Sequence, residues 1–187
     1  MAHQVVVVLG VPGAGKSTLC RRVASEAFGV EAVDFADLML SACPPQTDRD
    51  ALQYMGVTER RPLFALAKEQ LVGIVGSGNG TLLLEAHFVM RVNAKIESFG
   101  DGLLQLIKPH SLLLVDTTSS AVTDRRRLDA ERKRSPEGIG DIDELRGQTY
   151  LRAVDLSSKH SIPLKLVLNH NLRTAVSELL TLIPDNR

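Results

Sequence analysis

The sequence predicts an α/β fold in three layers, built on a doubly wound parallel sheet of five strands. Short apolar runs rich in Val, Leu and Ile alternate with longer amphipathic stretches, which is the pattern of successive βαβ units. The runs are continuous rather than alternating in polarity, as expected for strands that helices cover on both faces. The predicted strands are Val5–Leu9, Ala32–Asp34, Thr81–Glu85, Leu112–Asp116 and Leu164–Leu168.

Five helices are predicted around these strands. Apolar or small residues recur every three or four positions between Ile142 and Leu156, which indicates one buried helical stripe. The segment Ser41–Gln46 contains two prolines and reads as a loop, and the glycines at 76–80 end the preceding helix. The predicted helices are Gly15–Ala27, Thr58–Val75, Ser119–Arg134, Ile142–His160 and Leu172–Leu182.

Composition excludes several classes of protein. The chain has 187 residues, of which 44% are apolar, and its 22 Lys and Arg balance 22 Asp and Glu. One domain over residues 1–187 is the simplest organisation. Zero net charge argues against duplex binding, and 4% aromatic residues without Trp argue against stacking on single strands. Cys20 and Cys43 show no metal-site spacing, and no apolar run is long enough to span a bilayer. We therefore expect a soluble, cytoplasmic protein with no nucleic-acid or membrane partner.

The segment Gly10–Ser17 follows the first predicted strand and opens the first predicted helix. Its sequence, Gly-Val-Pro-Gly-Ala-Gly-Lys-Ser, matches the Walker A pattern, whose glycines let backbone N–H groups face phosphate oxygens. Lys16 would reach the β- and γ-phosphates, and the Ser17 hydroxyl would bind Mg²⁺. The sequence therefore predicts a site for a nucleoside di- or triphosphate.

This loop alone does not define the reaction. A kinase, a GTPase switch, and an ATPase or nucleotide-binding adaptor all remain open. The Asn-Lys-x-Asp segment of a guanine-specific switch has its nearest counterpart in Asn169–Leu172, which lacks the base-reading Asp. A GTPase switch is therefore the least favoured of the three.

Two predicted strands end in a carboxylate that could serve the metal ion. Glu85 ends the third strand and Asp116 the fourth. A carboxylate at a strand end facing the phosphates can orient Mg²⁺ or its water shell. Spacing along the sequence does not decide between them. Either one could instead cap the turn that follows its strand.

Positive charge is concentrated between Asp124 and Arg134, where six residues are basic. Arginines on a segment that closes over the site would stabilise the charge of a migrating phosphoryl group. A solvated helix face with compensating acids is the alternative. Arg125, Arg126, Arg132 and Arg134 are the candidates for this lid. Arg125 and Arg132 are seven apart and would share one face of a continuous helix.

Taken together, these segments resemble the archaeal-type adenylate kinases, a branch of the P-loop nucleoside monophosphate kinases. The matching segments are the Walker A loop, Asp48–Asp50, Glu85–His87, the arginine-rich stretch before Gly138, and Asn169–Asn171. The resemblance implies a P-loop kinase fold with an AMP-binding insertion near residues 35–75 and a short lid near 132–141. It implies the reaction Mg·ATP + AMP ⇌ 2 ADP, with Mg²⁺ as cofactor and a homotrimer as the assembly. A kinase for another nucleoside monophosphate, a broader phosphotransferase, and a nucleotide-binding adaptor or weak ATPase remain alternatives.

The resemblance also implies roles for individual residues. The catalytic residues would be Lys16, Arg125, Arg132 and Arg134. ATP would contact Gly10, Pro12, Gly13, Ala14, Gly15, Lys16, Ser17, Thr18, Asn169, His170 and Asn171. AMP would contact Phe35, Ala36, Asp37, Arg49, His87 and Arg91. The metal ion would bind Ser17 and Glu85, directly or through water.

The sequence departs from the family pattern at two of its positions. Glu85 stands where the family usually has Asp, and its extra methylene moves the carboxylate by about 1.5 Å. Leu40 stands where bacterial relatives place an arginine for AMP. Arg49 and Arg91 are therefore the candidates for the AMP phosphate. His87 could touch either nucleotide or stabilise a turn.

Overall fold

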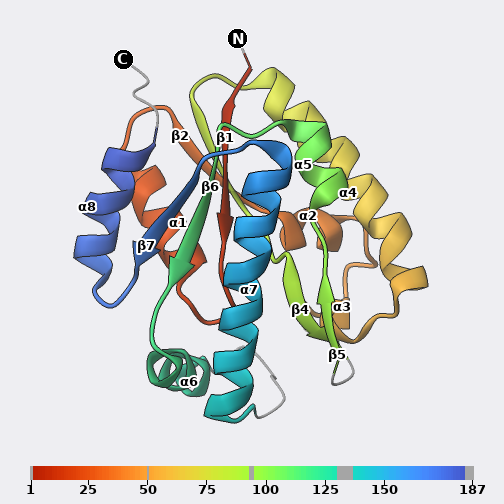
Figure 1. Ribbon diagram of the computed structural model, residues 1–187. Coiled ribbons are helices and arrows are strands. Elements are labelled where there is room, and N and C mark those ends of the chain that lie inside the picture. The colour runs from red at the N-terminus through yellow and green to blue at the C-terminus, as the bar shows by residue number, and fades with distance from the viewer. Residues whose placement is uncertain (1, 50, 93–94, 130–136, 184–187) are drawn as a thin grey trace.

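A computed structural model describes residues 2–49, 51–92, 95–129 and 137–183 of the chain. Its main sheet has five parallel strands in the order β2-β3-β1-β6-β7 (Figure 1). These strands are β1 (Gln4–Leu9), β2 (Val30–Asp34), β3 (Thr81–Glu85), β6 (Ser111–Asp116) and β7 (Leu164–Leu168). The predicted doubly wound parallel sheet is confirmed, and each of its strands overlaps a predicted one.

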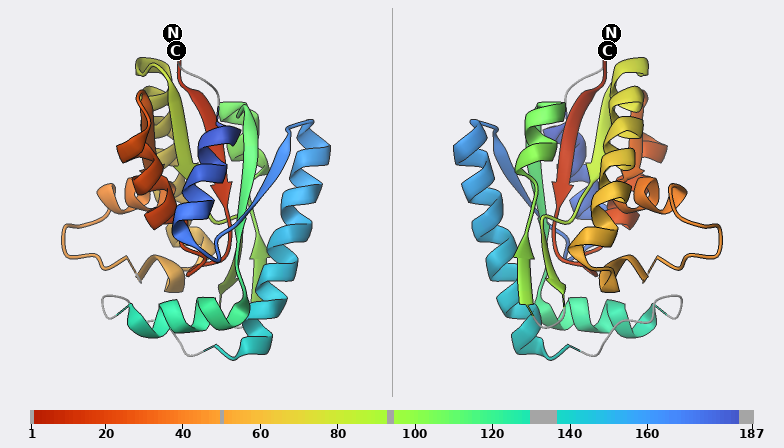
Figure 2. Two further views of the ribbon diagram at one scale, coloured as in Figure 1. Left: turned by 90° about the vertical axis from the view of Figure 1, so that its left-hand side faces the viewer. Right: turned by 90° about the vertical axis from the view of Figure 1, so that its right-hand side faces the viewer.

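Helices cover both faces of this sheet (Figures 1 and 2). One layer holds α1 (Lys16–Glu26) and α8 (Leu172–Leu182), and the other holds α4 (Val57–Ser77), α5 (Asp101–Ile107) and α7 (Ile139–His160). Side chains alternate between the faces of a strand. In β1, Val5, Val7 and Leu9 therefore pack towards α4, α5 and α7, whereas Val6 and Val8 pack towards α1 and α8.

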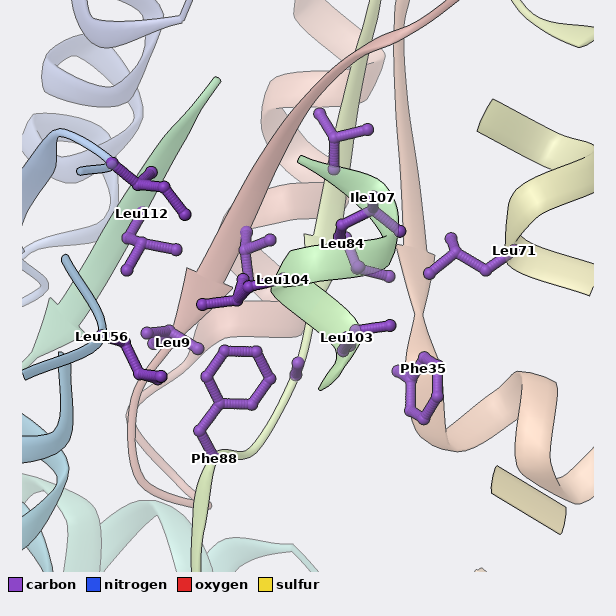
Figure 3. Packing of buried hydrophobic residues seen from close by; sticks show 14 of the residues in the cluster. Leu9, Phe35, Leu71, Leu84, Phe88, Leu103, Leu104, Ile107, Leu112 and Leu156 are labelled. Carbon is purple, nitrogen blue, oxygen red and sulfur yellow. The ribbon is translucent and has the colours of Figure 1, made fainter. Parts of the chain in front are cut away.

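The core on the α4–α5–α7 side is the larger of the two apolar clusters. Leu9 and Leu84 of the sheet lie against Leu104 of α5 and Leu156 of α7 (Figure 3). All four of these side chains are at most 2% exposed. Burying a leucine fully is worth about 1.5–3 kcal/mol, so this layer fixes the sheet on which the loops of the site are mounted.

Several elements differ from the sequence prediction. Helix α6 covers Ser119–Leu128 and is shorter than the predicted Ser119–Arg134. Four features were not predicted from the sequence: α2 (Phe35–Ser41), α3 (Ala51–Tyr54), α5, and an antiparallel hairpin of β4 (Val89–Val92) and β5 (Lys95–Ser98). Each of these helices and strands is at most seven residues long, so none carries enough turns or alternations for a periodic pattern to emerge.

The strand ends bring distant parts of the sequence to one edge of the sheet. Val8 of β1 pairs in register with Glu85, and Leu9 pairs with Leu114 two residues before Asp116. The loop after β1, the end of β3 and the end of β6 therefore share the carboxyl edge, where α6 also lies (Figure 2). This is the edge at which doubly wound sheets bind ligands. Among the described residues, none of the helices is both long and apolar enough to cross a membrane.

Candidate active site

The loop between β1 and α1, residues 10–17 and here called the phosphate loop, depends on glycine at two positions. Gly10 has a φ of 147°, and a Cβ there would lie 2.4 Å from the backbone oxygen of Val115. Gly15 has a φ of 87°, and a Cβ there would lie 2.5 Å from the Asn169 side-chain nitrogen. Both positions combine a left-handed backbone with a close neighbour, so any larger residue would displace the loop.

Lys16 begins α1, and its side chain turns back across the loop. Its Nζ donates hydrogen bonds to the carbonyl oxygens of Gly10 at 3.0 Å and Val11 at 3.3 Å. The residue is only 5% exposed, and burial lowers the pKa of the ammonium to about 8, although Glu85 opposes this shift. A buried cation that has lost its hydration shell interacts most favourably with a phosphate that takes the place of the lost water.

Ser17 and Glu85 lie together beside this lysine. The Ser17 hydroxyl donates to Glu85 Oε2 at 2.7 Å. Burial raises the pKa of the Glu85 carboxyl, while the bond from Ser17 opposes the rise. A hydroxyl and a carboxylate side by side are oxygen ligands of the kind that Mg²⁺ takes in nucleotide sites. These two residues therefore fit the metal ion that the sequence predicts.

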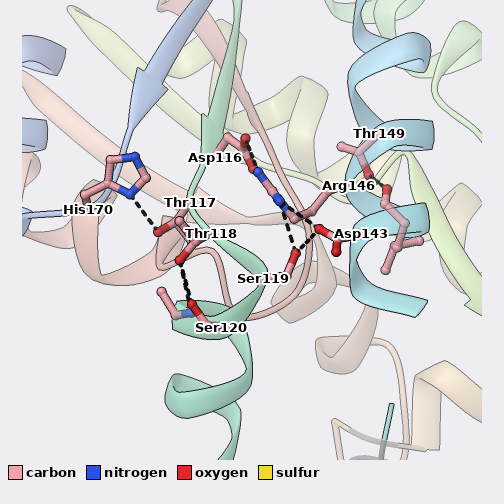
Figure 4. A network of polar contacts seen from close by, with 11 residues as sticks. Asp116, Thr117, Thr118, Ser119, Ser120, Asp143, Arg146, Thr149 and His170 are labelled. Carbon is pink, nitrogen blue, oxygen red and sulfur yellow. Dashed lines mark hydrogen bonds and ion pairs between the residues drawn. The ribbon is translucent and has the colours of Figure 1, made fainter. Parts of the chain in front are cut away.

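Asp116, the competing carboxylate, has a different partner. Arg146 of α7 donates two parallel hydrogen bonds to its carboxylate, from Nε to Oδ1 at 2.9 Å and from Nη2 to Oδ2 at 2.8 Å (Figure 4). The same arginine reaches Ser119 and Asp143. Because this bidentate pair occupies both carboxylate oxygens, Asp116 ties α7 to the end of β6, and the geometry favours Glu85 as the residue that serves the metal.

Two arginines of α6 bind the backbone of the phosphate loop. Arg125 donates to the carbonyl oxygens of Ala14 at 2.8 Å and Asn169 at 2.7 Å. Arg126 donates through Nε to the Pro12 carbonyl oxygen at 2.9 Å and forms an ion pair with Glu137. The predicted pairing of Arg125 with Arg132 required one continuous helix, but α6 ends at Leu128. Arg132 and Arg134 lie outside the described residues.

These groups surround a cavity of about 610 Å³ over the phosphate loop, here called the phosphate cavity. That volume suits a nucleotide, since small-molecule sites occupy roughly 300–1,000 Å³. The residues that line the cavity are Pro12, Gly13, Gly15, Lys16, Ser17, Thr18, Arg21, Asp34, Ala36, Arg49, Leu52, His87, Met90, Arg91, Arg125, Arg126, Asp129, Glu137 and Leu145. Cations from α1, α6, β4 and the α2–α3 loop thus border one space, as phosphoryl transfer needs.

Glu137 is an acid among these cations that the sequence analysis did not select. Its carboxylate pairs with Arg126 and approaches Arg91 Nε at 3.5 Å. Arg91 also pairs with Glu144 of α7 at 2.6 Å. The Glu137 carboxylate therefore joins two arginines that line the phosphate cavity, in a position where a phosphate would compete with it. Nothing in the sequence around Glu137 indicated this contact.

A second, mostly apolar pocket of about 280 Å³, here called the apolar pocket, adjoins the phosphate cavity. Five residues line both spaces: Asp34, Ala36, Leu52, His87 and Met90. The remaining lining residues are Phe35, Met39, Arg60, Arg61, Phe64, Ala86 and Phe99. The sequence predicted Phe35, Ala36 and His87 of this set, but it gave no sign of the lining residues from α4 and from the β5–α5 connection.

The candidate arginine Arg49 belongs to the α2–α3 loop, and its side chain reaches back to the start of α2. It forms ion pairs with Asp34, the residue that caps α2, and with Asp37 at 2.8 Å. Arg49 lines the phosphate cavity, whereas Asp37 lines neither space. Arg49 therefore borders the phosphate cavity, and its ion pairs with Asp34 and Asp37 hold it there; its contact with an acceptor phosphate stays a prediction.

The predicted residues after β7 contact protein groups. The Asn169 side chain donates to the Ala14 carbonyl oxygen at 2.9 Å, and Asn171 caps α8 by accepting from the Thr174 amide at 3.2 Å. His170 Nδ1 lies 3.4 Å from Thr117 Oγ1 (Figure 4). None of the three lines the phosphate cavity. Their contact with the donor base stays a prediction, and their visible role is to support the loop and the helix.

Solved structures of kinases share this fold at low sequence identity. Shikimate kinase from Bacteroides thetaiotaomicron aligns with a TM-score of 0.60 at 12% identity, covering 95% of this chain and 97% of its own. A gluconokinase from Sinorhizobium meliloti aligns with a TM-score of 0.55 at 18% identity, covering 96% and 93%. These likenesses show the α/β P-loop kinase fold.

Curated sequences extend the likeness along the whole chain. Adenylate kinase from Methanoculleus marisnigri is 26% identical over 98% of this chain and 100% of its own. The adenylate kinase of Thermococcus sibiricus is 28% identical over 96% and 94%, and that of Methanococcus aeolicus is 24% identical over 98% and 99%. A family model described as an AAA domain matches residues 9–143. Since that match covers well over half of the chain, the protein belongs to this AAA domain family.

Proposed function

We propose that this protein is an adenylate kinase that transfers the γ-phosphoryl group of ATP to AMP. One observation carries the proposal: a cation-lined phosphate cavity and an apolar pocket meet through shared lining residues. The first suits the phosphates of a donor and an acceptor, and the second suits a nucleobase. A polyhydroxylated acceptor would need polar partners along its whole length, whereas most of the residues that line the apolar pocket are apolar. The relatives named adenylate kinase support the same assignment.

The proposed mechanism relies on positioning and charge stabilisation. Backbone N–H groups of the phosphate loop and the Lys16 ammonium bind the β- and γ-phosphates. Arg125 and Arg126 stabilise the negative charge on the migrating group. Arg49 and Arg91 hold the AMP phosphate, whose oxygens are already ionised at neutral pH, so the attack needs no dedicated general base. Ser17 and Glu85 would hold Mg²⁺, which would supply further charge neutralisation when bound.

The test is an acceptor survey. Purified protein receives Mg·ATP with AMP, GMP, CMP or UMP in turn, and diphosphate formation is followed. Product with AMP alone supports the proposal, whereas product with several acceptors indicates a broader phosphotransferase. Inorganic phosphate released without any acceptor indicates the ATPase class. The homotrimer and the division into insertion and lid stay predictions from the resemblance, and the cytoplasmic location stays a prediction from the composition.

A further inference from the structure

Arg60 of α4 is a charged residue inside the apolar pocket. Its side chain is 12% exposed, although arginine is almost never this buried without partners. It lines the apolar pocket and is absent from the lining of the phosphate cavity. Arg60 therefore lies apart from the cations of the phosphate cavity, which would bind phosphates.

The charge of Arg60 is already compensated. Its Nη2 donates to Glu97 Oε2 of β5 at 3.3 Å, and its guanidinium carbon lies 5.7 Å from the centre of the Phe99 ring. That distance is within the range of a cation–π contact. The carboxylate and the ring hold the guanidinium in place, so the residue presents fixed donors and little uncompensated charge.

One buried donor of this group has no hydrogen-bond partner in the part of the chain that the structure describes. Arg60 Nε is buried and has no hydrogen-bond acceptor among the described residues. Leaving a buried donor unmatched is unfavourable, and such groups are uncommon in folded proteins. A ligand in the apolar pocket that brought an acceptor atom to Nε would remove this penalty, whereas a ligand without one would not.

We infer that Arg60 determines the specificity of the acceptor site by donating a hydrogen bond to one ring nitrogen of the acceptor's adenine. The inference rests on the proposed function, which places the base of AMP in the apolar pocket. Adenine carries acceptor nitrogens on its ring, including N3 and N7. Phe35 and Phe64, whose ring centres are 4.9 Å apart, provide apolar surface in the same pocket. Apolar contact would bind the ring, and Arg60 would select its identity and orientation.

The test compares AMP with 1-deaza-AMP, 3-deaza-AMP and 7-deaza-AMP, each of which lacks one ring nitrogen. Dissociation constants are measured by calorimetry for the wild type, for Arg60→Met, which keeps the apolar stem, and for Lys68→Met. Lys68 is the matched control, because it lies on the same helix and its ammonium is 5.1 Å from the Phe64 ring, yet it does not line the apolar pocket. Diphosphate formation from AMP is followed for all three proteins.

One analogue should bind the wild type and Lys68→Met about tenfold or more weakly than AMP, as expected for a lost charged hydrogen bond. In Arg60→Met the same analogue should bind as well as AMP. Comparison within each protein cancels any general effect of the substitution on the fold. Equal binding of all analogues to the wild type, or a difference that survives in Arg60→Met, would overturn the inference alone. Failure of AMP both to bind and to yield ADP would overturn the proposed function, and the inference with it.

Discussion

Replacing Lys16 with methionine should make the protein more stable while removing its nucleotide binding. The ammonium is buried at the start of α1, and its pKa falls from 10.5 to about 8 because burial disfavours the charged form. At pH 7 the lysine is protonated in both the folded and the unfolded chain, so the folded state carries the full penalty. Methionine keeps a chain of similar length without a charge to desolvate.

The size of the effect follows from this pKa difference. A shift of one unit corresponds to about 1.4 kcal/mol, so a fall from 10.5 to about 8 amounts to roughly 3 kcal/mol at pH 7. Between pH 8 and 10.5 the folded chain has largely lost the Lys16 proton, whereas the unfolded chain still carries it. The free energy of unfolding therefore rises with pH in this range. By pH 9.5 the penalty in the wild type should have fallen by about 2 kcal/mol.

The assay is urea unfolding of both proteins at pH 7 and pH 9.5, with ATP binding measured in parallel. Lys16→Met should have the larger free energy of unfolding at pH 7, and the advantage should shrink at pH 9.5. Lys68→Met, which removes a lysine of α4 that does not line the phosphate cavity, is the matched control for the loss of a lysine as such. A Lys16→Met protein that is no more stable at pH 7, or an advantage that is independent of pH, would refute the argument that this lysine is held desolvated for a phosphate.

Three further substitutions test the rest of the site. Arg49→Met should raise the KM for AMP about tenfold or more and change kcat less, because it removes a phosphate contact. Glu85→Gln should abolish Mg²⁺-dependent turnover. In the wild type, turnover should fall at acid pH as Glu85 becomes protonated. This fall should begin at a higher pH than for an ordinary glutamate, because burial raises the pKa of Glu85. Glu137→Gln should tighten the binding of inorganic triphosphate several-fold, since it weakens a competing anion beside Arg126 and Arg91.

Each of these substitutions has a result that counts against it. An unchanged KM for AMP would remove Arg49 from the acceptor site. For the metal role, Asp116→Asn is the matched control: it breaks the pair with Arg146 and should lower stability while Mg²⁺ dependence persists. If Asp116→Asn rather than Glu85→Gln abolished Mg²⁺-dependent turnover, the assignment of the two carboxylates would be reversed. Weaker triphosphate binding by Glu137→Gln would mean that Glu137 positions the arginines and does not compete for them.

The phosphate loop and the sheet could be predicted because their constraints are local. A buried parallel strand must be apolar throughout, and a loop that wraps phosphate needs glycine where a Cβ would collide, as at Gly10 against the Val115 oxygen. Such requirements appear directly in consecutive residues. The rule that ligands bind at the carboxyl ends of parallel strands brought Glu85 and Asp116 to this edge alike. Only the structure separates them, because Ser17 contacts Glu85 and Arg146 contacts Asp116.

The acceptor side could be predicted only in part, because long-range contacts between short elements build it. Arg60 meets Glu97, which is 37 positions away, and Arg91 meets Glu144, which is 53 positions away. Neither pair leaves a periodic signal. The hairpin that carries Arg91 and Glu97 has strands of four residues, too short for an alternating pattern to be recognised. The resemblance predicted Arg49 and His87 as AMP-binding residues, but no pattern in the sequence predicted Arg60.

The zero net charge of the chain conceals a difference among the arginines of the site. Arg49, Arg91 and Arg126 each pair with at least one carboxylate, whereas the hydrogen bonds of Arg125 go to the carbonyl oxygens of Ala14 and Asn169. A carbonyl positions a guanidinium without cancelling its charge, and a carboxylate does both. Phosphates must therefore compete with an acid for the first three arginines. No ion pair of Arg125 with a carboxylate is found among the described residues, so its charge should contribute, with those of Lys16 and Arg21, to the first attraction of a nucleotide.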